Sequence, residues 1–156
     1  MSQPLTWYTK PFSSLTINEL YDILKLRIDV FVVEQKCYYP EIDKHDKHPE
    51  TLHLFAYANN TIVAYLRILP KGTSYNNYIS LGRVVVAPAS RKLTIGHLLM
   101  EKALVRCKQH FFKQNIKISA QEHLEKYYKT HGFIRDSAMY LEDNIPHIAM
   151  LKKYEE

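Results

Sequence analysis

The spacing of apolar residues along this chain changes between a helical period and strict alternation, and it predicts ten elements of secondary structure. Apolar side chains recur at helical spacing from Ile17 onward, and Glu19 follows Thr16 by three residues, which is the pattern of a capping box. Alternation on either side of Asn59-Asn60 predicts an antiparallel hairpin. The predicted strands cover residues 5–10, 51–60, 61–70, 78–88, 116–121, 133–143 and 145–154, and the predicted helices cover residues 17–35, 89–113 and 122–131.

The predicted order, β-α-β-β-β-α-β-α-β-β, is mixed and not purely alternating. It indicates an α/β fold with a mixed, mostly antiparallel central sheet flanked by helices. With 156 residues, of which 46% are apolar, the chain is long enough for one domain with a sizeable core. We therefore expect residues 1–156 to form a single domain.

The cellular compartment is suggested by two sequence features. No apolar segment approaches the length that spans a membrane, and the first residues lack the apolar run of a signal peptide. The two cysteines, Cys37 and Cys107, lie far apart without a C-x-x-C pair, which argues against a disulfide scaffold or a thiolate zinc site. We expect a cytoplasmic protein with no membrane partner.

The net charge of +5 is unevenly distributed along the chain. Residues 91–118 carry seven cations against one glutamate, whereas residues 34–50 carry five acids against three lysines. Two solvated surfaces would explain this pattern, and so would two sites that attract ligands of opposite charge. A nucleic-acid binder is a further interpretation. The chain lacks an RNP-like aromatic signature and a recognisable DNA-reading motif, so we expect no nucleic-acid partner.

The segment ASRKLTIG, residues 89–96, places two cations and a glycine at the start of a predicted helix. The first amides of a helix are unpaired and its dipole adds partial positive charge, so a phosphate could approach the backbone at Gly96. The segment matches neither G-x-x-x-x-G-K-[ST] nor G-x-G-x-x-G, so nucleotide-driven chemistry is not indicated. A pyrophosphate site and a helix end with solvated cations are both consistent with these residues.

The segment VVVAPASRKLTIG, residues 84–96, resembles motif A of the GNAT (GCN5-related) N-acetyltransferases, in which V-x-P is followed by R/Q-x-x-G-x-G/A. Thr94 stands where the first glycine of that motif usually lies. The segment LEKYYKTHGF, residues 124–133, resembles motif B, whose tyrosine corresponds to Tyr128. The segments LRIDVFVVEQ, YYPEIDKHD, LGRVVVAP and EDNIPHIAM extend the resemblance to the ElaA-like branch of that family, over residues 26–150.

The resemblance implies an N-acetyltransferase with acetyl-CoA as co-substrate, bound where the central strand and the next strand separate. Its pantetheine would pair with the backbone of Val84, Val85 and Val86. Gln121 would lie where the family often has an asparagine that contacts the cofactor. The residues implied for the pyrophosphate are Arg91, Lys92, Leu93, Thr94, Ile95 and Gly96. Because Thr94 has less backbone freedom than glycine, weaker cofactor binding is expected, although its hydroxyl could donate to a phosphate oxygen.

The implied reaction is direct attack of an amine on the thioester carbonyl, which a backbone N–H near Val86 would polarise. Tyr128 would then protonate the departing thiolate, and core packing is the alternative role for this ring. A lysine-like amine is almost wholly protonated at pH 7, so a base is required. The strand segment ISLGRVVV has no glutamate for this role. Glu34 and Glu41 are the expected bases, and the other candidates are Asp43, His53, His123 and His147.

The partner implied by these residues is a cationic primary amine of a small molecule or peptide, drawn by the acidic segment. The residues Asp43, His45, Asp46, His48 and His53 give only a weak metal signal, and the implied reaction needs no metal, so none is expected. The absent strand glutamate and Thr94 leave a non-catalytic acyl-CoA-binding or regulatory module as the alternative function. A monomer and a homodimer are both consistent with the sequence.

Overall fold

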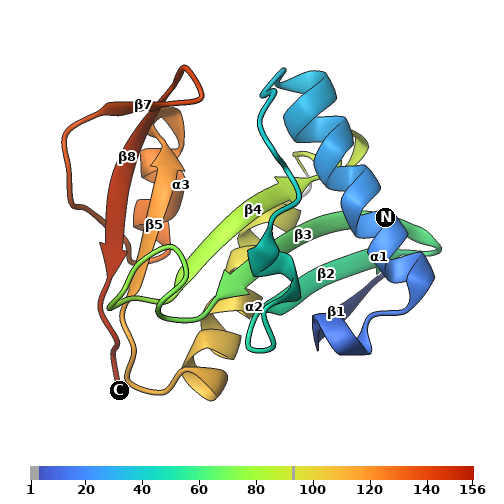
Figure 1. Ribbon diagram of the computed structural model, residues 1–156, viewed down its shortest axis with the longest axis horizontal. Helices are drawn as coiled ribbons and strands as arrows, with labels where there is room; N and C mark the ends of the chain where they lie inside the picture. The colour runs from blue at the N-terminus through green and yellow to red at the C-terminus, as the bar shows by residue number, and fades with distance from the viewer. Residues whose placement is uncertain (1–3, 93) are drawn as a thin grey trace.

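The computed structural model describes residues 4–92 and 94–156, which form two sheets and three α-helices (Figure 1). The strands are β1 (Leu5–Pro11), β2 (Leu52–Ala58), β3 (Thr61–Leu69), β4 (Ser80–Val86), β5 (Ile116–Gln121), β6 (Ile134–Arg135), β7 (Tyr140–Glu142) and β8 (Ile145–Lys152). The helices are α1 (Ile17–Arg27), α2 (Ile95–His110) and α3 (Glu125–Thr130). A π-helical segment, Ile28–Glu34, continues α1.

The first sheet has the order β1-β2-β3-β4, and the second has the order β5-β8-β6 with β7 also paired to β8. Neighbouring strands within each sheet are antiparallel. The predicted α/β class with helix-flanked antiparallel sheets is therefore confirmed. The capping box also forms, since the Thr16 hydroxyl accepts the Glu19 N–H and the Glu19 carboxylate accepts the Thr16 N–H.

Several predicted elements differ from the structure. The helix predicted over residues 17–35 is α-helical only to Arg27, and the helix predicted over residues 122–131 begins with a 3₁₀ turn, Glu122–Leu124. The strand predicted over residues 133–143 is divided into β6 and β7, because the Ser137 hydroxyl takes the place of a ladder carbonyl and accepts the Ala149 N–H at 2.9 Å. The second helix begins at Ile95 and not at residue 89. Its predicted first turn is a 3₁₀ turn, Pro88–Ser90, and the backbone becomes left-handed at Thr94.

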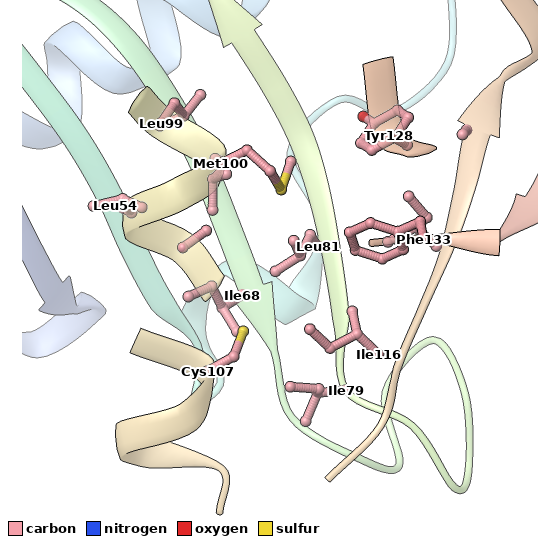
Figure 2. Packing of buried hydrophobic residues seen from close by; sticks show 14 of the residues in the cluster. Leu54, Ile68, Ile79, Leu81, Leu99, Met100, Cys107, Ile116, Tyr128 and Phe133 are labelled. Atoms are coloured by element: carbon pink, nitrogen blue, oxygen red, sulfur yellow. The ribbon is translucent and has the colours of Figure 1, made fainter. Parts of the chain in front are cut away.

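The two faces of the first sheet are covered by different helices (Figure 1). Leu54 and Leu66 belong to the cluster that packs against α2, whereas Phe55 and Tyr65 belong to the cluster that packs against α1. Consecutive residues of a strand point to opposite faces, which explains this division. Figure 2 shows the α2 cluster, which continues into the second sheet through Ile116. One continuous core therefore joins the two sheets on the α2 side.

Backbone pairing between the two sheets occurs, within the described residues, where β4 and β5 begin. Ile79 and Ile116 form a parallel bridge, in which the Lys117 N–H donates to the Ile79 carbonyl at 3.0 Å. Beyond this point β4 remains paired with β3 and β5 remains paired with β8, so β4 and β5 diverge (Figure 1). Arg83 has a φ of +52° and, with Val84, stands opposite the single residue Leu66. This bulge increases the local twist and turns β4 away from β5.

Candidate active site

A cleft of about 430 Å³ opens where β4 and β5 diverge. A cleft of this size accommodates a small organic ligand. Its walls come from β4, β5 and the β7–β8 hairpin, together with the segments before β2 and before β4. A second hollow of about 450 Å³ lies beside α2 and the end of β8, and it includes none of the predicted site residues that the structure describes. We therefore locate the candidate site in the cleft.

At Val86, one edge of β4 is turned away from β3. The Ala87 N–H donates to the Val63 carbonyl of β3 at 2.8 Å, so the preceding N–H, that of Val86, points to the opposite edge. The Val86 carbonyl accepts a hydrogen bond from Arg91 Nε at 3.2 Å, which places it on the same edge. Val84, two residues earlier, lines the cleft, whereas the Val85 side chain is buried against α1.

The start of α2 adjoins this strand edge. Thr94 is the N-cap residue, with φ +61° and ψ 5°, and Lys92 also has a positive φ of 72°. A β-branched residue rarely adopts this backbone conformation, which is the reason that glycine is common at such positions. Ile95 is buried in the core and anchors the first turn of the helix. Leu93, another predicted cofactor residue, lies outside the described residues.

Gly96 lies in the first turn of α2 and makes a specific contact with α3. Its carbonyl accepts a hydrogen bond from the Tyr127 hydroxyl at 2.6 Å. A β-carbon built on Gly96 would lie 3.8 Å from a Val86 methyl group and 3.9 Å from Tyr127, which are ordinary van der Waals distances. Protein packing therefore does not require glycine here, although glycine costs about 1 kcal/mol in a helix.

Tyr128 lines the cleft from α3 and is only 6% exposed. Its ring packs edge-on against Phe133, with centroids 5.8 Å apart (Figure 2). Burial raises the pKa of this phenol, so it remains protonated at neutral pH. The Tyr128 hydroxyl has no hydrogen-bond partner within residues 4–92 and 94–156. The ring is thus part of the core while the hydroxyl is available to a ligand in the cleft.

Arg91 and Glu34, two of the predicted site residues, are paired with each other. The guanidinium donates to both carboxylate oxygens, at 2.7 Å and 3.0 Å, and both side chains are about two-fifths exposed. Hydrogen bonding to Arg91 lowers the pKa of Glu34. A carboxylate with a lowered pKa is a weaker base, so this environment favours an ion-pair role for Glu34 over a role as the general base.

Glu41, the second predicted base, is buried in an arginine–carboxylate cluster. The cluster consists of Arg27, Arg67, Arg83, Glu41, Asp43 and Asp46. One Glu41 oxygen lies 2.7 Å from Arg27 Nε and 2.9 Å from Arg83 Nε, and the other accepts the Tyr39 hydroxyl at 3.2 Å. Both carboxylate oxygens of Glu41 thus have donors from the protein itself, and two of these donors are guanidinium groups.

The same cluster changes the interpretation of the acidic segment. Asp46 pairs with Arg27 at 2.8 Å and with Arg67 at 2.9 Å, and Asp43 pairs with Arg67 at 2.6 Å. Three carboxylates are thus neutralised by three arginines from other parts of the chain. The acidic segment expected to draw a cationic acceptor, residues 34–50, therefore has three of its five carboxylates already paired with guanidinium groups.

The remaining predicted bases lie in different surroundings. His53 is buried, with Nδ1 2.8 Å from the Tyr65 hydroxyl and Nε2 2.9 Å from the Asp46 carbonyl, and burial lowers its pKa. His123 is exposed and does not line the cleft, whereas His147 is buried and does. Among the described residues, no group of three or more His, Cys, Asp or Glu side chains is arranged to hold a metal ion.

The second sheet supplies a wall of polar side chains, of which the sequence predicts Gln121 and His147 but not Ser119 and Glu142. Gln121 was predicted, and it lines the cleft with its amide 3.4 Å from Gln35. Ser119, Glu142 and His147 line the cleft beside it. The signal that could have located this wall is alternation, because every second residue of β5 and β8 faces the same side.

No helix within the described part of the chain is both long and apolar enough to cross a membrane. Residues 21–154 match the family model for an acetyltransferase (GNAT) domain. Protein ElaA of Escherichia coli is 38% identical over 149 residues, which cover 96% of this chain and 97% of that protein. A UPF0039 protein of Schizosaccharomyces pombe is 44% identical over 147 residues, which cover 94% of this chain and 95% of that protein.

Solved structures show the same similarity. An acyl-CoA N-acyltransferase from Pseudomonas aeruginosa matches with a TM-score of 0.91 and 42% identity, over 96% of this chain and 99% of that chain. The crystal structure of Escherichia coli ElaA matches with a TM-score of 0.90 and 37% identity, over 96% of this chain and all of that chain.

Proposed function

The chain belongs to the GNAT acetyltransferase family, and from this premise we propose that it transfers an acetyl group from acetyl-CoA to a primary amine by direct attack. Membership in this family supports acyl-CoA-dependent acyltransferase activity. The acetyl donor, the primary-amine acceptor and the site residues are parts of the proposal. The observation that carries it is the edge of β4 at Val86, whose N–H is turned away from β3 and which adjoins the start of α2 and a cleft that Tyr128 lines.

The cofactor would lie along β4 and end at α2. The Val86 N–H points away from β3 and is suited to pair with an amide carbonyl of the pantetheine arm, as another strand would, and Val84 lines the cleft nearby. The amides from Lys92 to Gly96 would bind the pyrophosphate at the positive end of the helix dipole. Gly96 supports this placement, because no neighbouring protein atom requires a glycine there and a phosphate approaching the backbone would.

The chemistry would take place beside Val86 and Tyr128. The Val86 N–H is positioned to polarise the thioester carbonyl as negative charge develops on its oxygen. The amine nitrogen forms a bond to the carbonyl carbon, the carbon–sulfur bond breaks, and the Tyr128 phenol protonates the thiolate. The raised pKa of Tyr128 keeps this proton in place at neutral pH until the sulfur departs.

The proposed compartment for this reaction is the cytoplasm. Cys37 and Cys107 are both buried free thiols. A reducing compartment maintains thiols in this state, whereas secreted proteins commonly oxidise their cysteines to disulfides.

Two measurements test the proposed function. Acetyl-CoA should raise the melting temperature of the protein, because a ligand that binds only the folded state stabilises it. A panel of primary amines, assayed by the release of free CoA thiol, should then contain acceptors that are turned over. Longer acyl-CoA donors in the same assay define the donor. Binding of acetyl-CoA without CoA release from any amine would favour the non-catalytic acyl-CoA-binding module.

A further inference from the structure

Six side chains of the second sheet share the face that borders the cleft. His147 of β8 stands opposite Gln121 of β5 on one side and opposite Tyr140 of β7 on the other. Two residues away along each strand lie Ser119, Ile145 and Glu142, which therefore point to the same face. Five of these six residues line the cleft, and Tyr140 stacks on the His147 ring with centroids 6.3 Å apart.

Glu142 and His147 are held together by specific contacts. Glu142 Oε1 accepts a hydrogen bond from the Ser119 hydroxyl at 3.0 Å, and Oε2 lies 3.4 Å from His147 Nε2. His147 Nδ1 lies 2.7 Å from the Ile145 carbonyl oxygen. A carbonyl oxygen only accepts, so Nδ1 carries the hydrogen of this contact and leaves Nε2 as the second ring nitrogen. The Nε2 atom of His147 therefore faces the carboxylate of Glu142.

Glu142 differs from the carboxylates that sequence reasoning favoured. Glu34 is paired with Arg91, and Glu41 is buried between two arginines. Glu142 has no lysine or arginine partner within the described residues, and its side chain is 50% exposed. Asp143 also lines the cleft without a cationic partner, but no hydrogen bond from the described residues orients it. Glu142 is thus the oriented carboxylate of the cleft that remains available to a cation.

We propose that Glu142 binds the ammonium group of the acceptor and removes its proton, and that His147 is the positioning residue behind it. This assignment rests on the proposed N-acetyltransferase function and identifies the acceptor side of the same cleft. It takes as acceptor a primary ammonium group on an aromatic or apolar body, because Tyr75 lies near the carboxylate and Tyr39 lines the same cleft.

The proton inventory of the reaction is balanced in this arrangement. The first proton leaves the ammonium nitrogen for Glu142, from which it passes to His147 Nε2 or to solvent. The neutral nitrogen then attacks the thioester carbon and the carbon–sulfur bond breaks. The thiolate takes a proton from Tyr128, and the second proton lost by the nitrogen restores that phenol. One acetylation therefore releases one proton overall, through the Glu142–His147 pair.

The groups that face this pair from neighbouring elements are mostly neutral. Ser119 and Gln121 lie on β5 and Tyr140 lies on β7. Tyr75, from the segment before β4, has its pKa raised to about 12, first by burial and then by the charges of Tyr140 and Glu142. Asp143 adds a second negative charge at the rim. An ammonium ion entering the cleft therefore meets negative charge on this wall.

The test compares two acceptors of nearly the same shape, benzylamine and O-benzylhydroxylamine, in the CoA-release assay. Benzylamine is protonated at pH 7, whereas the alkoxyamine is neutral and needs no base before attack. Glu142→Gln should lower kcat/KM for benzylamine on the order of 100-fold at pH 7, and for O-benzylhydroxylamine by less than about threefold. The deficit with benzylamine should shrink as the pH is raised, because the free amine then forms in solution.

His147→Gln should show a smaller loss with the same dependence on acceptor and pH. If His147 had a purely structural role, its substitution would instead lower kcat/KM equally for the two acceptors. Glu101→Gln, a carboxylate on the exposed face of α2 outside the cleft, should behave as the wild type. Equal losses for the two acceptors, or unchanged benzylamine turnover in Glu142→Gln, would overturn the assignment. Failure of the proposed function gives a different pattern, in which the wild type releases no CoA whichever acceptor is supplied.

Discussion

Arg91 and Glu34 form a two-point ion pair that joins the loop before α2 to the end of the π-helical segment. Arg91 Nη2 lies 2.7 Å from Glu34 Oε1 and Nη1 lies 3.0 Å from Oε2, although the two residues are 57 positions apart. If Arg91 binds the pyrophosphate of CoA, the phosphate and Glu34 compete for the same guanidinium. The ion pair would then hold the Arg91 side chain at the site and also reduce its availability to the phosphate.

The competition predicts opposite effects for the two partners. Arg91→Ala should weaken CoA binding by about tenfold, because a charge-assisted contact is lost. Glu34→Gln should tighten CoA binding by about twofold to fivefold, because the arginine is released. Titration calorimetry with CoA measures both. Arg106→Ala, which replaces an exposed arginine within α2, is the control and should bind CoA as the wild type does. An unchanged affinity of Arg91→Ala for CoA would show that Arg91 does not bind the cofactor.

Tyr128→Phe tests the proposed acid. The substitution keeps the ring against Phe133 and removes a hydroxyl without a partner among the described residues, so the melting temperature should change little. The value of kcat should fall on the order of 100-fold, with the KM for acetyl-CoA nearly unchanged, as for an interaction made in the transition state. Steady-state kinetics give both constants. Tyr21→Phe, on the exposed side of α1, is the control. A kcat equal to that of the wild type would show that Tyr128 is a packing residue and not the proton donor.

Thr94→Gly should stabilise the protein. Thr94 adopts a φ of +61°, and the left-handed conformation costs an L-residue about 1–2 kcal/mol. Glycine removes this strain but adds unfolded-state freedom worth about 0.4–1 kcal/mol, so a net gain near 1 kcal/mol or less is expected. The corresponding rise in melting temperature is about 2–4 °C at most, measurable by calorimetry. Thr94→Ala keeps a β-carbon and should gain less.

The same pair of Thr94 variants separates two effects on CoA binding. If the side chain crowds the phosphate, Thr94→Gly should bind CoA more tightly than Thr94→Ala. If the hydroxyl donates to a phosphate oxygen, both variants should bind more weakly than the wild type. Equal affinities in all three proteins would place residue 94 away from the cofactor.

The arginine–carboxylate cluster predicts a defined loss of stability in acid. Burial alone would raise the pKa of Asp43, but its hydrogen bonds and charge pairing with Arg67 lower it from 3.8 to about 2. A carboxyl whose pKa is lower in the folded state contributes stability above its unfolded value and loses it as the pH falls. The free energy of unfolding in urea should therefore decrease between about pH 4 and pH 2. Asp43→Asn should reduce this slope, whereas Asp136→Asn, at an exposed position, should not.

Several features of this protein follow from local sequence patterns. The capping box of Thr16 and Glu19 and the hairpin at Asn59 involve residues within a few positions of one another, so their geometry is set by short-range sterics and hydrogen bonds. The alternation of β2 and β3 likewise determines which side chains are buried. These patterns, with the ordered motifs around Thr94 and Tyr128, were sufficient to predict the fold class and the family.

The partners of the charged residues were decided only by the tertiary structure. The sequence predicts Glu41 and Glu34 as bases because the strand segment ISLGRVVV has no glutamate. The folded chain instead places guanidinium groups from distant segments against both. Glu142 and His147 lie five positions apart, but their pairing depends on the β7–β8 hairpin and on Ser119 of a separate strand. Periodicity specifies the face on which a side chain lies. The distance between two charges, which sets their pKa and their reactivity, exists only once the sheets have packed.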